Sequence, residues 1–469
     1  MQEHTQLTQK QINEDLLKGV LGVPKWWLPA VLFLGLVVAL GLGSFGFMVY
    51  HGLGVTGLNR PVMWGFFIAN FVFWIGISHA GIMISAILRL TQAEWRRPIT
   101  RAAEVMTVFS LIAALHTPLF HVGRPWRVAY WIFPYDFDRG IWPNVRSPFV
   151  WDPSAVGTYL IGSSLFVFVC LLPDFAIVRD RVKNSLMKKF YSGISLGWRG
   201  TPRQWRMQTL AGILLSALVL PVFVSVHSIV SWDFAVLIGV EGWHSTIFAP
   251  YFIIGAIHSG VSAVAMLMAL SVWLYGLDKY IKPDHFDAIA RLLIVVATTW
   301  FFFFFLEWIY ALYTLESPEI ALRELQVFQW PYGALFMVFL VTSFFIPVPL
   351  WLFKRFRRSA KIMFWSTILV NIGMWLERFL IVIPGLARRG HMTFDWGTYH
   401  PSIIEILIVV ETFAFVALGM LLFAKIFPLI PLFDVKEGMV FRRLIKVGRK
   451  TVPATVREGL PHHYYEKYH

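Results

Sequence analysis

The sequence predicts an all-α membrane protein that crosses the bilayer ten times. Three observations support this fold class. Of the 469 residues, 57% are hydrophobic and only 14% are charged, too few charges to cover a soluble protein of this length. Ten apolar runs are long enough to cross about 30 Å of hydrocarbon. The basic residues gather in alternate loops, and the alternating pattern of a membrane β-barrel is absent.

The ten runs are expected to be helices, because backbone groups in lipid must be hydrogen-bonded within their own segment. They cover residues 27–50, 62–90, 102–120, 154–178, 209–231, 247–275, 286–313, 331–353, 361–386 and 402–428. The first run is too long for the core of a signal peptide, so we expect it to be retained as a span. We therefore divide the chain into an N-terminal segment at 1–25, a membrane domain at 26–430 and a basic tail at 431–469.

The distribution of Lys and Arg predicts the orientation of the chain. If the N-terminus is cytoplasmic, 32 of the 41 basic residues face the cytoplasm, 8 face outside and Arg378 lies within a span. This asymmetry predicts that both termini are cytoplasmic, so that residues 1–25 and 431–469 lie inside. The net charge of +14 is then explained by topology and by contact with lipid headgroups, not by nucleic-acid binding.

The cysteine content limits the redox chemistry of the chain. Cys170 is the single cysteine, which excludes an internal disulfide, a cysteine-ligated iron–sulfur cluster and covalently attached haem. A b-type haem would need axial histidine pairs on facing helices at matching depths, for which His79, His116, His227 and His258 are the candidates. We expect no haem, no iron–sulfur cluster and no metal site in this chain.

Ionisable residues at membrane depth are costly and are therefore candidates for function. They are His79, His227, His258, Glu307, Glu377, Arg378, Glu405 and Glu411, with His116, His121, Asp152 and Asp233 near the outer ends of spans. Most of them fall in the half of the membrane that the predicted topology places outside. This skew predicts a titratable site near the outer surface.

His121 and Asp152 are the pair most suited to such a site, because the loop between them can return both to one level of the membrane. A histidine can accept a proton from a hydroxyl group such as that of a quinol, and a carboxylate can orient the ring and stabilise its cation. Asp233 could complete a polar pocket. The alternative is that His121 and Asp152 only cap helices and hold the loop in place.

Two further groups have open interpretations. Glu377 and Arg378 point about 100° apart on a helix, so we expect each to pair with another helix, with Glu307 or Glu411 as the partner of Arg378. They form either a structural ion pair or part of a proton path or quinol contact. His79 and His258 are either interhelical hydrogen bonders or members of a proton route.

Several stretches together carry a family resemblance. They are WIGISHAGIMISAILRL (74–90), FHVGRPWRVAYWIFPY (120–135), WPNVRSPFVWD (142–152), LPDFAIVRDR (172–181), SLGWRG (195–200), SVHSIVSWDFAV (225–236), GWHSTIFAPYFIIGAIHSG (242–260) and NIGMWLERFLIV (371–382). They span most of the chain and resemble the NrfD/PsrC family of membrane subunits. Within that family the resemblance is closest to the ten-helix, quinol-binding subunits of alternative complex III known as ActC.

The resemblance implies two four-helix bundles plus two further helices, in the bacterial inner membrane. It implies a menaquinol site near the outer face, beside an iron–sulfur cluster of a partner subunit. By motif, His121 and Asp152 match the quinol-pocket pair, and Asp233, Arg378 and His79 match further polar positions. The other implied partners are cytochrome c subunits and a second NrfD-like subunit. Candidates for a proton route are His79, His258, Glu307, Glu377, Glu405 and Glu411.

Three other functions remain open from the sequence. A secondary transporter would show inverted repeats and broken helices around a midplane site, and no such symmetry is evident. A structural or proton-conducting membrane anchor would keep the fold without quinol chemistry. A quinone-reducing subunit would use the same pocket in the opposite direction, which depends on the potentials of its partners.

Overall fold

A computed structural model describes residues 8–127, 140, 142, 148–387, 399–440, 442–447 and 450–455. Within these residues, ten helical segments are long and apolar enough to cross a membrane. They are α2 (Trp27–His51), α3 (Phe66–Leu90), α4 (Thr100–Val122), α6 (Pro148–Arg179), α8 (Pro202–Trp232), α9 (Phe248–Tyr275), α10 (Pro283–Thr314), α12 (Tyr332–Leu340) continued by η6 (Val341–Phe345) and α13 (Pro347–Leu352), α15 (Ala360–Ala387) and α16 (Ile403–Ile426). All ten predicted spans are confirmed.

Shorter elements connect and flank these spans. They are α1 (Gln9–Leu21), η1 (Leu53–Val55), η2 (Glu94–Arg96), η3 (Pro125–Arg127), α7 (Ser185–Ile194), η5 (Asp233–Ile238), α11 (Ser317–Phe328), α14 (Lys354–Arg357), α17 (Leu432–Val440) and the strands β1 (Arg442–Val447) and β2 (Lys450–Thr455). Helix α8 begins earlier than hydropathy predicts, because Thr201 and Gln204 form a capping box and Pro202 occupies the first turn. Its first turns are polar and lie outside the apolar run.

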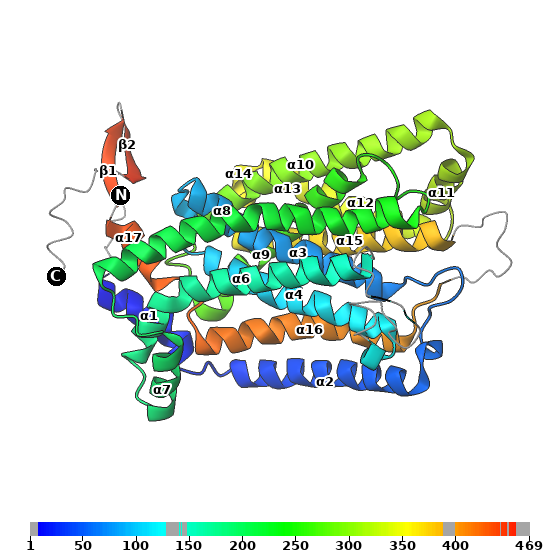
Figure 1. The fold of residues 1–469 in the computed structure, drawn as a ribbon. Helices are drawn as coiled ribbons and strands as arrows, with labels where there is room; N and C mark the ends of the chain where they lie inside the picture. Colours follow the sequence, from blue (N-terminus) through cyan, green and yellow to red (C-terminus); the bar gives the residue numbers. More distant parts are fainter. Residues whose placement is uncertain are drawn as a thin grey trace.

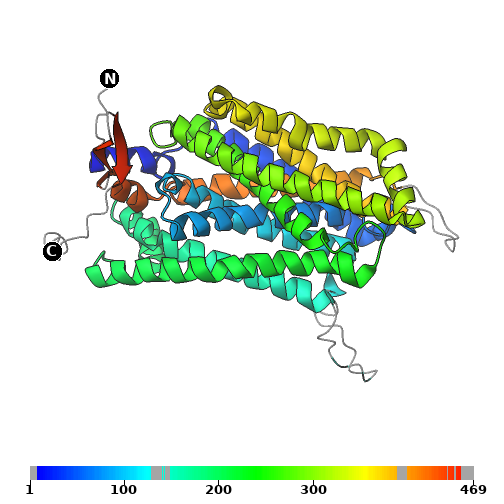
Figure 2. The same ribbon diagram turned by 90° about the horizontal axis from the view of Figure 1, so that it is seen from above.

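The spans form two four-helix bundles and one additional pair (Figures 1 and 2). The first bundle contains α3, α4, α6 and α8, and the second contains α9, α10, α12–α13 and α15. Helix α3 packs against α9 and α15, which joins the bundles. Helices α2 and α16 pack on each other along one side, where α16 also touches α4. This architecture confirms the predicted fold class.

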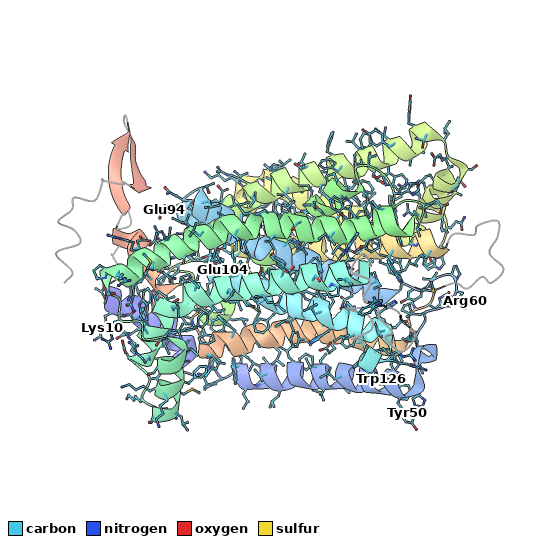
Figure 3. The ribbon with its side chains drawn as sticks, viewed as in Figure 1. Lys10, Tyr50, Arg60, Glu94, Glu104 and Trp126 are labelled. Carbon is cyan, nitrogen blue, oxygen red and sulfur yellow. The ribbon has the colours of Figure 1, made fainter. Side chains whose placement is uncertain are left out.

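The two ends of the molecule differ in what they carry. Helices α1 and α17 and the β1–β2 hairpin lie at one end, which we call the terminal face (Figure 1). Lys10 and Glu94 lie toward this end, whereas Tyr50, Arg60 and Trp126 lie at the opposite end, which we call the distal face (Figure 3). The charge distribution predicts that the terminal face is cytoplasmic.

Helix α3 is the central helix of the fold, because small residues let its neighbours approach closely. A Cβ on Gly81 would lie 2.1 Å from the carbonyl oxygen of Ala103 on α4. A Cβ on Gly260 of α9 would lie 2.3 Å from that of Ala80. As a result 89% of the α3 span is buried, so a polar side chain on it has only protein groups as partners.

The start of the C-terminal tail is docked on the terminal face. Arg96 contacts Asp434 at 3.1 Å, and Arg97 contacts Glu437 at 2.7 Å. Burial alone would raise the pKa of Asp434, but Arg96, Arg89, Arg97 and Arg101 outweigh it and hold that pKa below its usual value. These ion pairs hold α17 on the terminal face. The tail histidines lie outside the described residues.

Candidate functional site

Three helices, α4, α6 and α8, have an end at the distal face. His121, Asp152 and Asp233 lie at these ends. His121 lies in the last turn of α4, which ends at Gly123 in the left-handed conformation (φ +67°). Asp152 lies in the first turns of α6. Asp233 follows α8 directly and opens the π-helical segment η5, a type of turn that is frequent at functional sites. The sequence placed His121 and Asp152 just outside their spans, whereas both are inside the helices.

The carboxyl groups of Asp152 and Asp233 lie within hydrogen-bonding reach of each other. A hydrogen bond between two carboxyl groups requires a proton on one of them, because carboxylate oxygens only accept. Asp233 is 6% exposed. Within the described ranges, Oδ1 of Asp152 and both carboxyl oxygens of Asp233 receive no hydrogen bond from a donor group. The pair therefore presents buried acceptors that a ligand hydroxyl could satisfy.

His121 contributes a second unsatisfied group at this level. Its Nδ1 is buried and has no hydrogen-bond partner in the part of the chain that the structure describes. The sequence grouped Asp152 with His121 and Asp233, and Asp233 lies within hydrogen-bonding reach of Asp152. Much of the loop between His121 and Asp152, at residues 128–139, 141 and 143–147, lies outside the described residues.

Two buried histidines lie deeper in the first bundle. His227 of α8 and His79 of α3 are both 0% exposed, and their ring centroids are 4.5 Å apart. Nε2 of His79 lies 3.2 Å from the carbonyl oxygen of Phe223, which makes His79 an interhelical hydrogen bonder, as one of its two predicted roles required. The hydroxyl of Tyr159, whose ring lies 5.1 Å from that of His79, donates to the Ser78 carbonyl at 3.1 Å.

A third polar group fills the first bundle near the terminal face. Arg101 contacts Asp174 at 2.8 Å and Glu104 at 3.8 Å, and Ser85 donates a hydrogen bond to Glu104. All three charged side chains are at most 2% exposed. Figure 3 shows Glu104 inside the helix bundle, between the Glu94 end and the middle of the spans.

The sequence interpretation missed these charges, which extend the titratable groups beyond the predicted outer half. Glu104 and Asp174 lie inside the predicted spans 102–120 and 154–178, so they could have been recognised as ionisable residues at membrane depth. With them included, titratable groups occur along the whole height of the first bundle. The distal site is one end of this column.

Several side chains contact the buried carboxylate of Glu377 in the second bundle. Oε1 of Glu377 accepts hydrogen bonds from the Tyr251 hydroxyl and, at 2.8 Å, from the Trp300 indole. Its Oε2 lies 3.4 Å from Nη1 of Arg378. Glu377 therefore bonds to two other helices, as expected, and its additional contact with Arg378 was not expected. The side chains are long enough to meet although their Cα–Cβ bonds diverge.

Glu307 and Glu411 are not the partners of Arg378. Glu307 accepts from the Ser245 hydroxyl at 2.6 Å and lies 3.8 Å from Arg323. Both oxygens of Glu411 are buried without a hydrogen-bond partner in the described residues, where α16 meets Gly41 of α2.

Glu405 has a structural set of contacts. Its carboxylate accepts from the backbone N–H groups of Gly57 at 2.7 Å and Ser402 at 3.0 Å and from the Tyr399 hydroxyl at 3.0 Å. These bonds cap the first turn of α16 and hold the loop that joins α2 to α3.

A small cavity of about 30 Å³ joins the two carboxylates of the second bundle. Glu307 and Arg323 line it on the distal side, and Glu377 and Tyr251 line it at greater depth. By the same measure one water needs about 10–15 Å³, so the space fits about two waters. His258, which contacts the Ser343 carbonyl at 3.1 Å and stacks on Trp300, is the next histidine of this bundle.

One backbone carbonyl connects the polar groups of both bundles. The oxygen of Phe252 lies 3.1 Å from Nε2 of His227 and 3.5 Å from Nη2 of Arg378. The Arg378 guanidinium also lies over the Phe252 ring, at 4.3 Å from its centroid. Arg378 is therefore placed beside His227 and not at the distal carboxyl pair.

Comparison with known proteins identifies the family of this chain. Residues 54–389 match the family model described as "Polysulphide reductase, NrfD". The chain is 25% identical over 437 residues to a putative membrane subunit of a dimethyl sulfoxide reductase from Halobacterium salinarum, an alignment that covers 88% of this chain and 92% of that protein.

Two further relatives match over nearly their full length. An Hdr-like menaquinol oxidoreductase integral membrane subunit of Archaeoglobus fulgidus is 24% identical over 87% of this chain and 94% of its own length. A selenate reductase subunit of Mesobacillus selenatarsenatis is 20% identical over 86% of this chain and 93% of its own length. Ten apolar spans and a family match over more than half of its residues show that this chain is a multi-pass integral membrane protein of the NrfD family.

Proposed function

We propose that this chain is the quinol-binding subunit of an alternative complex III, and that it oxidises menaquinol at the distal carboxyl pair. The observation that carries the proposal is the contact between Asp152 and Asp233, which leaves buried acceptors at the membrane's predicted outer face. A quinol offers the missing donors, because each of its two hydroxyl groups can donate one hydrogen bond.

The proposed reaction converts menaquinol to menaquinone with loss of two protons and two electrons. His121 accepts one proton through Nδ1, and the Asp152–Asp233 pair, which shares one proton before the reaction, accepts the other on its remaining carboxylate. Both protons leave to the distal side. The electrons pass to an iron–sulfur cluster of a partner subunit, because a single cysteine cannot hold a cluster here.

The names of the relatives favour quinol chemistry over a bare anchor. One relative is named as a menaquinol oxidoreductase subunit, and the two others are named as subunits of reductases. For this chain we propose an iron–sulfur subunit, cytochrome c subunits and a second NrfD-like subunit as partners, in the bacterial inner membrane. The exposed Trp126, Trp151 and Trp232 beside the site suit such a contact, because aromatic residues are enriched at interfaces.

The buried column of the first bundle is the proposed route for translocated protons, in addition to the two that the quinol releases on the distal side. It runs from Asp233 through His227 and His79 toward Glu104 and Asp174 at the terminal face. Along α8, Asp233 and His227 are six residues or about 9 Å apart, so water must bridge parts of the route. A branch in the second bundle runs from Glu307 through the cavity to Glu377 and reaches His227 at the Phe252 carbonyl. Since Glu405 is fully bonded, the route does not include it.

Turnover of the purified complex with menaquinol tests the proposed site. Asp152→Asn and His121→Gln should lower the rate about 10²–10⁴-fold, the usual contribution of a general base. Every partner should still co-purify with the variant chain. Asp278→Asn and His51→Gln are matched controls, because both side chains are exposed and neither belongs to the site. Wild-type turnover in His121→Gln would remove His121 from the reaction.

The same variants separate the alternatives. A structural or proton-conducting anchor predicts that quinol turnover, measured with an electron acceptor, is unaffected by Asp152→Asn. A quinone-reducing subunit predicts that the variant loses quinone reduction driven by a partner's reductant, while wild type shows no quinol oxidation.

A further inference from the structure

A large apolar groove lies on the opposite half of the membrane from the carboxyl pair. It has a volume of about 580 Å³, and its walls come from α3, α9, α15 and α16. It runs along α9 from Ala263 to Tyr275, roughly 18 Å at the rise of an α-helix. Since α9 ends at the terminal face, the groove covers about one leaflet of a bilayer whose hydrocarbon is about 30 Å thick.

The groove offers almost no polar groups to an occupant. The Ser271 hydroxyl donates to the Leu267 carbonyl at 2.8 Å, and the Asn371 amide donates to Ser262 and Thr367. The indole of Trp74 donates to Thr412 at 2.8 Å. Oδ1 of Asn371 is an exception, because it is buried without a hydrogen-bond partner among the described residues. The part of an occupant that enters the groove is therefore mostly hydrocarbon, and cavities of about 300–1,000 Å³ are the size that buries a small ligand.

The mouth of the groove is polar and lies beneath α1. A second cavity of about 470 Å³ shares Leu274, Tyr275 and Leu429 with the groove and is also lined by Asp15 and Lys18. The acidic side chain of the mouth is already paired, because Asp15 contacts Lys279 at 3.3 Å. Lys18 is exposed there and has no ion pair among the described residues.

Two further contacts shape this mouth. Nζ of Lys425 donates to the carbonyls of Val20 at 2.8 Å and Gly22 at 2.7 Å, which fixes the end of α1 over the groove. The Tyr275 hydroxyl lies at the junction of the two cavities and is buried without a hydrogen-bond partner in the described part of the chain. A phosphate or ester oxygen would satisfy it.

We propose that this groove binds one anionic phospholipid from the leaflet on the terminal side. An acyl chain occupies the space between α9, α15 and α16, and the phosphate lies near Lys18 and the Tyr275 hydroxyl. The predicted orientation makes this the cytoplasmic leaflet, where anionic lipids concentrate. The lipid proposal concerns residues that take no part in the proposed quinol chemistry. The lipid proposal and the proposed quinol function can therefore fail independently.

Photolabelling of the purified complex tests the proposal. The complex is reconstituted into phosphatidylcholine vesicles that contain phosphatidylglycerol with a diazirine in one acyl chain, and adducts are mapped by mass spectrometry. We expect adducts on the facing segments of α9, α15 and α16. Ala417→Phe should abolish them, because Ala417 lines the groove and a phenyl ring would fill it. Lys18→Gln should weaken phosphatidylglycerol labelling about fivefold, the effect of one lysine near an anionic leaflet.

Leu36→Phe is the matched control for Ala417→Phe, because Leu36 is exposed on α2 and does not line the groove. It should leave the adducts unchanged. Thermal unfolding of each variant complex shows whether the fold is retained. Equal labelling in Ala417→Phe and wild type would overturn the proposal. The proposal would also be overturned if a photoactivatable menaquinone analogue labelled the same segments and prevented the phospholipid from labelling them.

Discussion

The two four-helix bundles treat their buried charges differently. In the first bundle, the Asp152–Asp233 pair and His121 keep polar atoms for which the described residues supply no partner. In the second, Oε1 of Glu377 has two hydrogen-bond donors, and its Oε2 lies 3.4 Å from Nη1 of Arg378, although neither of these two atoms has a hydrogen bond among the described residues. A buried polar group without a partner costs about 1–3 kcal/mol. In the first bundle a ligand that donates hydrogen bonds could offset this cost, whereas in the second the opposite charges and two donors from other helices already offset much of it.

The difference separates a reactive site from a supporting one. Unsatisfied acceptors at the distal ends of α4, α6 and α8 are placed to bind and deprotonate a hydroxyl group. The Glu377–Arg378 pair is placed to hold α9, α10 and α15 together and to set the surroundings of His227 through the Phe252 carbonyl. The following predictions test this division.

The largest effect is expected at the carboxyl pair. Asp233→Asn should lower menaquinol turnover by about 10²–10⁴-fold, because the amide cannot accept a proton. If Asp152 and Asp233 act as one unit, Asp152→Asn combined with Asp233→Asn should cost little more than either change alone. Steady-state turnover of the three purified complexes measures this. If the turnover losses of the two single variants multiply in the double variant, the two carboxyl groups do not share a proton.

The next effect is on stability and concerns the second bundle. Arg378→Met leaves Glu377 without its cation and should destabilise the protein by about 3–5 kcal/mol, since breaking a buried pair strands a charge. Glu377→Gln together with Arg378→Met should recover part of this loss. The apparent midpoint of thermal unfolding compares the variants. A single variant as stable as wild type would show that the pair is not structural.

A smaller effect is expected on proton transfer through the first bundle. Glu104→Gln removes a titratable group near the terminal face but leaves the distal carboxyl pair intact. In vesicles, the number of protons released per electron should fall, while quinol turnover in the presence of an uncoupler should stay near that of wild type. An unchanged proton ratio would exclude Glu104 from the route.

The smallest effect is expected for the docked tail. The pKa of Asp434 is held below its usual value, so the carboxylate stabilises α17 at neutral pH. This contribution is present above the ordinary aspartate pKa of about 4 and is lost as the pH falls through the lowered pKa. Asp434→Asn should mimic the acid state and speed trypsin cleavage after Lys436. Equal cleavage of variant and wild type at neutral pH would show that Asp434 does not hold α17 in place.

The spans could be predicted from the sequence because hydropathy over a bilayer thickness is a local property. Their partnerships depend on side-chain length and on helices that are distant in the sequence. The adjacent Glu377 and Arg378 were expected to diverge, yet their long side chains meet at 3.4 Å. Asp233 was expected near Asp152 without a stated contact, because the register of α6 against α8 is set by packing. Arg101 was assigned to a loop because the predicted run began at residue 102, and Glu104 and Asp174 were missed although they lie within predicted spans.

The most direct test of the account is to locate a bound quinone in the complete complex. A photoactivatable menaquinone analogue, or density for menaquinone in a structure, should place the ring between the start of α6 and the end of α8, with an oxygen within hydrogen-bonding distance of Asp152 or Asp233. His121 should contact the other side of the ring. A quinone ring bound elsewhere, with both aspartates facing protein alone, would contradict the central claim.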